Sequence, residues 1–456
     1  MRLLPCTISL AGKSGSVATD CIVPYPKDVL ERLSAPDIKG CSSSLHVWKF
    51  VICYLLLKIR WAAALLLVGG IGCMQVARAA TVPSFQFGDV TIKPYATEQL
   101  DIGGFPQTSQ AVPGVGVRAG RLRNGARITI HNQIELGGIW DFGPAPGGQM
   151  RLFEGQASYV GLKHFVFTIG IFKPSFGLES MQAQGDTTFI ERSSISTITR
   201  NIAAGIERQA VQIEAHGQRY HVALSGTAGT AGPGENGNQR AIVFRLVGVP
   251  IRMKDLLIHI GFSGEWVFRA AHSPGEKPGM AFSDYPEMNV GLTSKYLNTD
   301  RLTLNSVGAF GLEAAAAWKR FLFQGEAYDI VAKRSVENDT RHLNFSGWYA
   351  QTSYTLIGKA RQWKSRAAAF SSPVCDKKQD VLCHGSGVLE AAARYSEANL
   401  HSGSINGGQQ KAWSATLNWW PVDILKIALQ YEYGTIQGGR KPENFHAILS
   451  MIQIKF

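Results

Sequence analysis

The sequence predicts an all-β fold, in which sixteen antiparallel strands close into a transmembrane β-barrel with one loop folded inside as a constriction. Three observations favour this class. The 456 residues combine 45% hydrophobic and 18% charged residues with 49 glycines, which excludes a disordered chain and favours many turns. Polar and apolar residues alternate with a period of two up to the C-terminus. Beyond the N-terminal leader the chain has no apolar run long enough for a membrane-spanning helix, so a membrane crossing requires a closed barrel.

Residues 46–79 have the features of a signal peptide. Lys58 and Arg60 precede a short uncharged run, and Ala77 and Ala79 then supply the small-x-small pattern of a cleavage site. The alternative is a retained membrane helix, which would bury both cations at a cost of about 2.5 kcal/mol or more each. We therefore expect export across the inner membrane of a Gram-negative cell.

The chain divides into four segments on this interpretation. Residues 1–45 show no apolar periodicity and are interpreted as an extension upstream of the true start, ahead of the leader. Residues 80–114 are expected to form either an N-terminal periplasmic segment or a first strand. Residues 115–456 are expected to form the barrel.

The strands are predicted from alternation, which is clearest at the end of the chain. Leu425, Ile427, Leu429 and Tyr431 share one face, and the opposite parity carries lysine, glutamine and glutamate. Seventeen such segments can be distinguished, and because bacterial barrels use even numbers we predict sixteen strands. Thirteen of the segments are Val115–Arg123, Arg127–Asp141, Leu152–Gly161, Phe165–Phe172, Ile206–Ala215, Arg219–Thr227, Ala241–Val249, Leu256–Gly264, Met288–Leu297, Arg301–Phe310, Leu312–Trp318, Arg320–Ile330 and Phe345–Leu356, and four more lie downstream.

Aromatic residues and the last residue indicate the outer membrane. Trp419 and Trp420 end one strand, and Tyr431 and Tyr433 lie near the end of the next, as in the aromatic girdles of transmembrane barrels. The terminal Phe456 follows alternating apolar residues, which resembles the recognition signal of outer-membrane barrels. We expect lipid and lipopolysaccharide as surroundings, and the barrel-assembly machinery as a partner that binds this terminus.

Two groups of polar residues are candidates for pore chemistry, because the lumen of a sixteen-stranded barrel holds water. Arg121, Arg123 and Arg127 share one parity with further polar residues and form a basic track if they face inward, although Asn124-Gly125 could break the register. The alternative places these arginines at the headgroups, beside lipopolysaccharide phosphates.

The second group lies in the stretch from Lys173 to Ala204, which lacks strand alternation. If it folds into the lumen, its cations and hydroxyls could replace the hydration shell of an anion, because guanidinium pairs match oxyanions. If it stays outside, they are ordinary loop residues. The candidates are Lys173, Arg192, Ser193, Ser194 and Arg200.

The later strands temper an anion-selective interpretation. Their lumen-parity residues include the cations Arg394, Lys426 and Lys455 but also three glutamates. This half of the predicted lumen is therefore nearly balanced in charge. The glutamates are Glu326, Glu390 and Glu432.

Cys375 and Cys383 lie in a polar insertion between two strands, which we expect on the long-loop side outside the cell. A disulfide is expected, because export crosses an oxidising periplasm. The alternative, a metal site completed by His384, has too few ligands. No G-x-S-x-G or H-E-x-x-H motif occurs, so we expect a non-enzymatic protein without metal, cofactor or nucleic-acid partner.

Three ordered blocks resemble the phosphate-selective porin O and P family. IGIFKPSFGLESM…TTFIERS is similar to its G-x-F-K-x-P-F-x-L-E … E-R signature, and FSGWYAQTSYTLIG is similar to its G-W-Y-x-x-x-S-Y-x-L-x-G strand. The third block, LEAAARYSEANL…INGGQQKAWSATLNWWP…ILKIALQYEY, resembles the closing segment, with Trp420 where tyrosine is usual.

The resemblance implies a trimer of sixteen-stranded barrels, in which an internal loop constricts a basic channel for phosphate or related anions. By motif, Lys173, Glu191 and Arg192 would belong to the constriction, and Arg121 to the early arginines. We therefore expect passive diffusion of small anions, phosphate or polyphosphate, through a homotrimeric pore.

Two alternatives remain open at this point. A general or sugar-passing porin would place Trp413, Trp420 or Tyr349 along the pore. An outer-membrane adhesin or enzyme would use the barrel only as an anchor, although the sequence contains neither a catalytic signature nor an inserted domain.

Overall fold

A computed structural model describes residues 84–107, 115–143, 150–230, 238–273, 275–288, 290, 295–334, 342–375, 386–439 and 442–456. Residues 1–45, the predicted signal peptide at 46–79 and Cys383 therefore lie outside the described part. Within it, no helix has the length and apolar character to cross a membrane.

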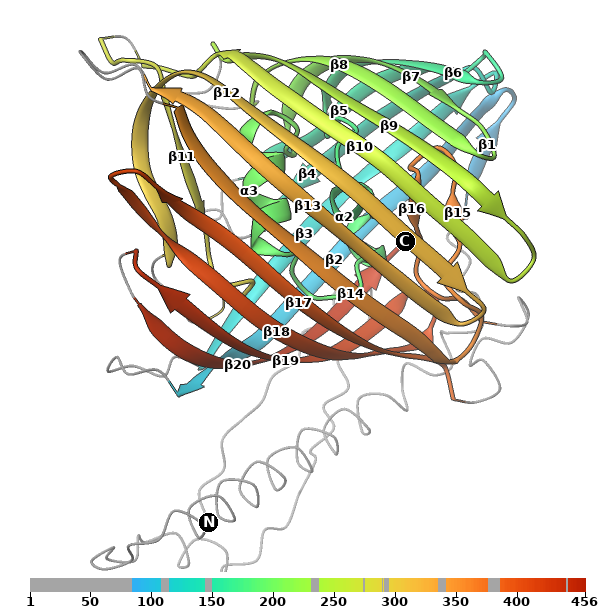
Figure 1. Cartoon of the computed structure of the whole chain (residues 1–456). Coiled ribbons are helices and arrows are strands. Elements are labelled where there is room, and N and C mark those ends of the chain that lie inside the picture. Colours follow the sequence, from blue (N-terminus) through green and yellow to red (C-terminus); the bar gives the residue numbers. More distant parts are fainter. Residues whose placement is uncertain are drawn as a thin grey trace, which may run out of the picture. The chain divides into compact units, whose positions relative to one another are not determined.

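One antiparallel sheet closes on itself to form a barrel (Figure 1). Of its eighteen strands, β1 (Phe85–Phe87) and β11 (Gly279–Asp284) are short additions that pair with β2 and β12. The other sixteen form the ring, which β2 closes by pairing with both β3 and β20. These strands are β2 (Val90–Gln107), β3 (Val115–Ile130), β4 (Ile134–Asp141), β5 (Arg151–Tyr159), β6 (Phe165–Phe172), β7 (Arg208–His216), β8 (Tyr220–Thr230), β9 (Arg240–Arg252), β10 (Leu256–Arg269), β12 (Leu297–Trp318), β13 (Phe321–Arg334), β14 (His342–Ile357), β17 (Val388–Ser402), β18 (Ile405–Val422), β19 (Leu425–Gln437) and β20 (Glu443–Lys455).

Alternation along each strand separates a lipid face from a lumen face. In β19, Leu429 and Tyr431 are exposed on the outside, whereas Lys426, Gln430 and Glu432 are buried on the inside. This arrangement follows from the pleat, which sends successive side chains to opposite faces, while ring closure pairs the backbone groups that hydrocarbon could not solvate. The predicted sixteen-stranded transmembrane barrel is confirmed.

Several predicted strand boundaries were wrong, although the predicted number of strands in the ring, sixteen, was correct. Arg301–Phe310 and Leu312–Trp318 belong to one strand, β12, and among the described residues of Met288–Leu297 only Leu297 lies in a strand, as the first residue of β12. β2 is absent from the seventeen predicted segments, although residues 80–114 were left open as a first strand. Its alternation is weak because Pro94 and the polar Glu98 share the parity of the exposed Leu100 and Ile102.

The turn expected near Asn124-Gly125 lies further along the chain. β3 continues through both residues to Ile130, and the hairpin turns at His131 and Asn132, whose φ angles are 49° and 54°. Two residues with positive φ are the geometry of a tight hairpin, which asparagine tolerates. A register shift opposite Gln99 and Leu100 lets β3 cross the wall without breaking.

The two ends of the barrel differ in their connections. The turns after β3, β7, β9, β12 and β18 are short and lie at the same end as Phe456. The long connection between β14 and β17, which carries Cys375, also leaves from this end. We predicted this connection among the long loops at the other end, because the long connections of outer-membrane barrels usually lie on the extracellular side. In this barrel, a long connection leaves from the end with the short turns.

Candidate functional site in the barrel lumen

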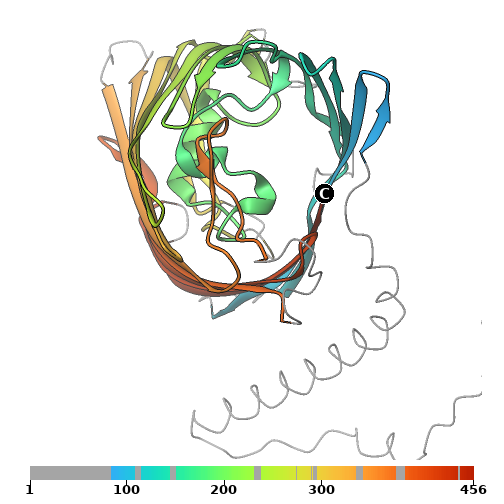
Figure 2. The same ribbon diagram turned by 90° about the vertical axis from the view of Figure 1, so that its right-hand side faces the viewer.

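Two segments enter the lumen from opposite ends. The first joins β6 to β7 and contains α2 (Leu178–Met181), the 3₁₀ turn η4 (Gln184–Asp186) and α3 (Ser194–Ala203). The second contains the hairpin of β15 (Trp363–Lys364) and β16 (Ala369–Phe370). Figure 2 shows both inside the ring of strands, the helices in green and the hairpin in orange. We call the first segment, residues 173–207, the inward loop; its entry into the barrel was predicted and is confirmed.

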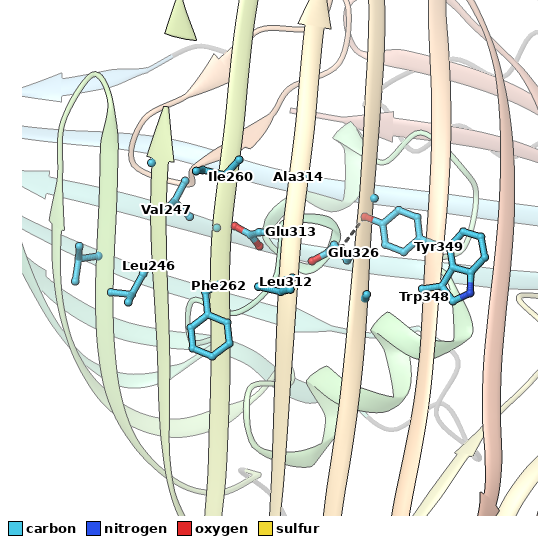
Figure 3. Close-up of a pocket in the computed structure, with 15 residues that line it drawn as sticks. Leu246, Val247, Ile260, Phe262, Leu312, Glu313, Ala314, Glu326, Trp348 and Tyr349 are labelled. Atoms are coloured by element: carbon cyan, nitrogen blue, oxygen red, sulfur yellow. Dashed lines mark hydrogen bonds between the residues drawn. The ribbon is translucent and has the colours of Figure 1, made fainter. Parts of the chain in front are cut away.

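Glu326 fixes the start of the inward loop. This β13 carboxylate accepts hydrogen bonds from the backbone N–H groups of Leu178 at 2.5 Å and Glu179 at 2.9 Å. The hydroxyl of Tyr349 donates to it at 2.7 Å (Figure 3). Carboxylates stabilise the first turn of a helix because it leaves its N–H groups without intrahelical partners. Glu326, which was predicted to add negative charge to the lumen, thus binds the backbone of the inward loop.

Arg192 holds the middle of the inward loop together. Its Nε donates to the carbonyl of Glu179 at 3.1 Å, Nη2 to that of Gln182 at 3.0 Å and Nη1 to Gln184 Oε1 at 2.7 Å. Only 4% of the residue is exposed. Each of its nitrogens is therefore engaged within the loop, and the residue serves first to set the loop's shape.

Ser193 and Ser194 begin α3 and are also buried. Ser193 donates its hydroxyl to Glu179 Oε2 at 2.9 Å and caps the helix by accepting from the N–H of Ser196. Ser194 donates its hydroxyl to the carbonyl of Tyr285 at 3.2 Å. Ser193 is thus the N-cap of α3, and the hydroxyls of both serines are engaged with the protein.

A buried ion cluster ties the inward loop to the far wall. Arg394, from β17, donates to Glu179 Oε1 at 3.2 Å and to Glu287 Oε2, and its guanidinium lies 4.3 Å from the ring centre of Phe189. Sequence reasoning placed Arg394 in the lumen but did not find Glu287, because that glutamate lies outside any strand and no pattern marks it.

A second group of cations lies on the opposite side of the loop, around β3. Arg121 donates to Glu191 Oε2 at 3.2 Å, and Arg118 lies 3.9 Å from Glu191 Oε1. Arg123 donates to Asp141 at 2.8 Å and stacks 3.8 Å above Phe153. These contacts place the early arginines inside the barrel.

Lys173 and Arg200 complete this basic group. Burial, together with repulsion from Arg192, Arg200 and Arg123, lowers the pKa of the Lys173 ammonium well below its ordinary value. Lys173 donates to the carbonyl of Ser180. Among the described residues, Arg200 has no hydrogen-bond or ion-pair partner, and its Nε is buried. The group therefore retains an unused guanidinium at a position of concentrated positive charge.

Arg127 lies further along β3 and is more open. Its side chain is 54% exposed, donates to Glu154 at 3.0 Å and lies 5.3 Å from the ring centre of Tyr95. Arg121, Arg123 and Arg127 thus all face the lumen, but they differ in how much of each guanidinium remains accessible.

The β15–β16 hairpin narrows the other end of the lumen. Arg366 contacts Glu135 at 2.7 Å and Glu214 at 3.3 Å, and Arg361 binds Glu390 through two bonds of 2.6 and 2.8 Å. Cys375 is disulfide-bonded; the predicted partner, Cys383, lies outside the described residues, so the pairing stays a prediction.

Among the residues that the structure describes, the three aromatic candidates do not form a rail along the open lumen. Trp413 is 60% exposed on the lipid face, whereas Trp420 and Tyr349 face inward but are buried beneath the loops. On the outer wall, a shallow apolar groove is lined by Leu246, Phe262 and Trp348 among others (Figure 3). Its composition suits contact with lipid chains. No group of three or more potential metal ligands occurs in the described residues.

Comparison with known proteins gives relatives of similar length. An uncharacterised protein of Caulobacter vibrioides is 24% identical over 377 residues, which cover 79% of this chain and 72% of the relative. Porin O of Pseudomonas aeruginosa is 22% identical over 307 residues, covering 61% of this chain and 67% of that porin.

Solved structures share the fold. OmpT, an outer membrane protein of Vibrio cholerae, superposes with a TM-score of 0.51 at 11% identity, covering 82% of this chain and 99% of that protein. OprB of Pseudomonas putida gives 0.50 at 8% identity, with 80% and 94% covered. The family described as phosphate-selective porin O and P matches residues 122–456. The chain is thus an outer-membrane β-barrel porin and belongs to the phosphate-selective porin O and P family.

Proposed function

We propose that this porin passes small anions, phosphate among them, by passive diffusion. The observation that carries the proposal is the basic group on one side of the inward loop, where the charges of Arg118, Arg121, Arg192 and Arg200 act on a single loop carboxylate, Glu191. Excess positive charge in a narrow, partly desolvated passage attracts anions and repels cations.

Within this group the residues have different roles. Arg200 and Arg127 are the best candidates for direct contact, because one lacks a protein partner and the other is half exposed. Guanidinium groups offer paired donors that match the oxygens of phosphate. Arg192, Ser193 and Ser194 support the site by fixing the loop that carries it.

The surroundings of the pore follow from the same proposal. The exposed apolar strands would face lipid and lipopolysaccharide, the alternating C-terminal strand with Phe456 would be recognised by the barrel-assembly machinery, and residues 46–79 would direct export. A homotrimer is proposed from the family resemblance. No aromatic rail lies open to the lumen among the described residues, which favours anions over sugars as the transported class.

The proposal is tested in planar bilayers with the purified porin. The reversal potential under a KCl gradient should be that of an anion-selective pore, and added phosphate should reduce the chloride current. Arg200→Gln should weaken this block about five- to tenfold, because it removes a guanidinium that has no protein partner. Arg320→Gln, which removes an exposed arginine at the barrel end, is the matched control and should leave the block unchanged. A cation-selective reversal potential would refute the proposal.

A further inference from the structure

The placement of Glu191 points beyond anion attraction in general. Its backbone is anchored to one wall of the barrel: Arg394 Nη1 donates to its carbonyl at 3.1 Å, and the preceding N–H of Ile190 donates to Gln430 at 3.0 Å. Its side chain extends to the other side, toward β3. The backbone of Glu191 is therefore fixed, and its side chain reaches the arginines of β3.

Glu191 contacts two guanidiniums as a small oxyanion would. Oε2 accepts from Arg121 at 3.2 Å, and Oε1 lies 3.9 Å from Arg118 Nη1, an ion-pair distance too long for a hydrogen bond. Each oxygen faces a different arginine. The carboxylate thus joins two arginines, one by a charge-assisted hydrogen bond and one by a longer ion pair.

The site is incompletely satisfied around this carboxylate. Arg118 Nη1 and Arg200 Nε are buried and have no hydrogen-bond partner. Buried donors left unpaired cost free energy, so they indicate room for a ligand that offers more oxygens than one carboxylate. Burial alone would raise the pKa of Glu191, but Arg121, Arg118, Arg192 and Arg200 together hold it below its ordinary value. The carboxylate is thus a charged occupant.

Glu191 can also leave. Its side chain is 23% exposed, and Arg118 and Arg121 are the only ion-pair partners of its carboxylate among the described residues. By contrast, the carboxylate of Glu179 is 4% exposed and is bound by Arg394 and Ser193. Of these two carboxylates in the inward loop, Glu191 is the one that contacts the basic group and is also partly exposed.

We propose that Glu191 is a tethered ligand of this porin: its carboxylate occupies the arginine site between Arg118 and Arg121 and is displaced by each anion that passes. This inference rests on the proposed function. When the pore is empty, the carboxylate keeps two like charges together; when an anion arrives, the carboxylate competes with it. The competition keeps binding weak enough for release, which conduction requires.

Glu191→Gln tests the inference, because glutamine keeps an acceptor for Arg121 but removes the competing charge. The matched control is Glu154→Gln, which removes another lumen carboxylate paired with one arginine, Arg127 at 3.0 Å. Both variants change the lumen by the same net charge. The readout is the phosphate concentration that halves the chloride current in a planar bilayer, with thermal stability and protease resistance of the loop measured alongside.

We expect Glu191→Gln to lower the half-blocking concentration about tenfold and Glu154→Gln to lower it less than about twofold, since only the first vacates the occupied site. Glu191→Asp, whose charge is retained on a side chain one methylene shorter, should fall between wild type and Glu191→Gln. If Glu191→Asp has the half-blocking concentration of the wild type, the length of the side chain does not matter, and the tethered ligand is refuted.

Other outcomes separate the two proposals. Equal shifts for Glu191→Gln and Glu154→Gln would mean that only the general field matters, and an unchanged or higher half-blocking concentration in Glu191→Gln with an intact loop would exclude competition. Either result refutes the tethered ligand while leaving an anion-selective porin. Absence of anion selectivity in the wild type would refute the proposed function itself.

Discussion

The two sides of the lumen use arginine in opposite ways. On the side of β9 and β17, Arg245 and Arg394 are fully buried and bind carboxylates at 2.9 and 3.2 Å. On the β3 side, Arg127 retains an exposed side chain and Arg118 a partly exposed one, and in the inward loop Arg200 has no hydrogen-bond or ion-pair partner among the described residues. The same residue type therefore builds structure where its donors are filled and offers binding where they are not.

Loss of Arg394 should have the largest effect. Arg394→Gln would leave the buried carboxylates of Glu179 and Glu287 without their cation, and we expect destabilisation of about 3–5 kcal/mol. The measurement is thermal unfolding of the barrel in detergent, followed by the heat-dependent shift in gel mobility.

The comparison is sharpened by Arg127→Gln on the other side. That ion pair is half exposed, and its loss should cost about 1 kcal/mol or less. Equal losses of stability in the two variants would contradict the division between structural and available arginines.

The next effect concerns the start of the inward loop. Gly177 has a φ of +64°, and a Cβ there would lie 2.3 Å from the Tyr328 hydroxyl oxygen. Gly177→Ala should weaken docking of the loop by about 1–3 kcal/mol, read as faster proteolysis within residues 173–207 and a larger single-channel conductance. Gly226→Ala, where the nearest atom is 3.7 Å away, is the control; comparable proteolysis of both variants would refute the anchoring role.

The smallest expected effect is a pH dependence of selectivity through Lys173. Burial and the neighbouring arginines lower the pKa of its ammonium, so its charge is present at low pH and is lost as pH rises through that lowered value, before an exposed lysine would titrate. Sulfate selectivity should therefore decline with rising pH, and Lys173→Met should flatten the profile. A flat wild-type profile would show that the ammonium contributes nothing to selectivity.

The barrel could be predicted because the alternation that marks a membrane-spanning strand is contained within each strand. Alternation in β19 and β20 depends only on which face meets lipid, and it is visible in the sequence alone. β2 was not among the predicted strand segments for a physical reason too: Pro94 and the polar Glu98 interrupt the parity that faces lipid, which weakens its alternation. Strand boundaries also depend on pairing with neighbours, which no single segment contains.

The site was predicted in its residue types but not in their division of labour. Lys173 and Arg200 could be selected because they lie in a stretch without strand alternation. Nothing in the sequence indicates that Arg192 would donate its hydrogen bonds to backbone carbonyls of the same loop. Glu287 and Arg361 act through contacts with residues more than a hundred positions away, at Arg394 and Asp186. Such partners are set by ring closure, so they appear only when all strands are in register.

One contact links the position of the inward loop to the closure of the strand ring. The penultimate residue, Lys455, lies 2.9 Å from the carboxylate of Asp186 in the inward loop, and its strand forms the seam with β2. Because the same carboxylate also accepts from Ser372 of the second inward segment, it joins three parts of the chain that synthesis delivers far apart in time. This three-way contact is therefore complete only after the last strand has arrived, so the interior assembles together with the wall that encloses it.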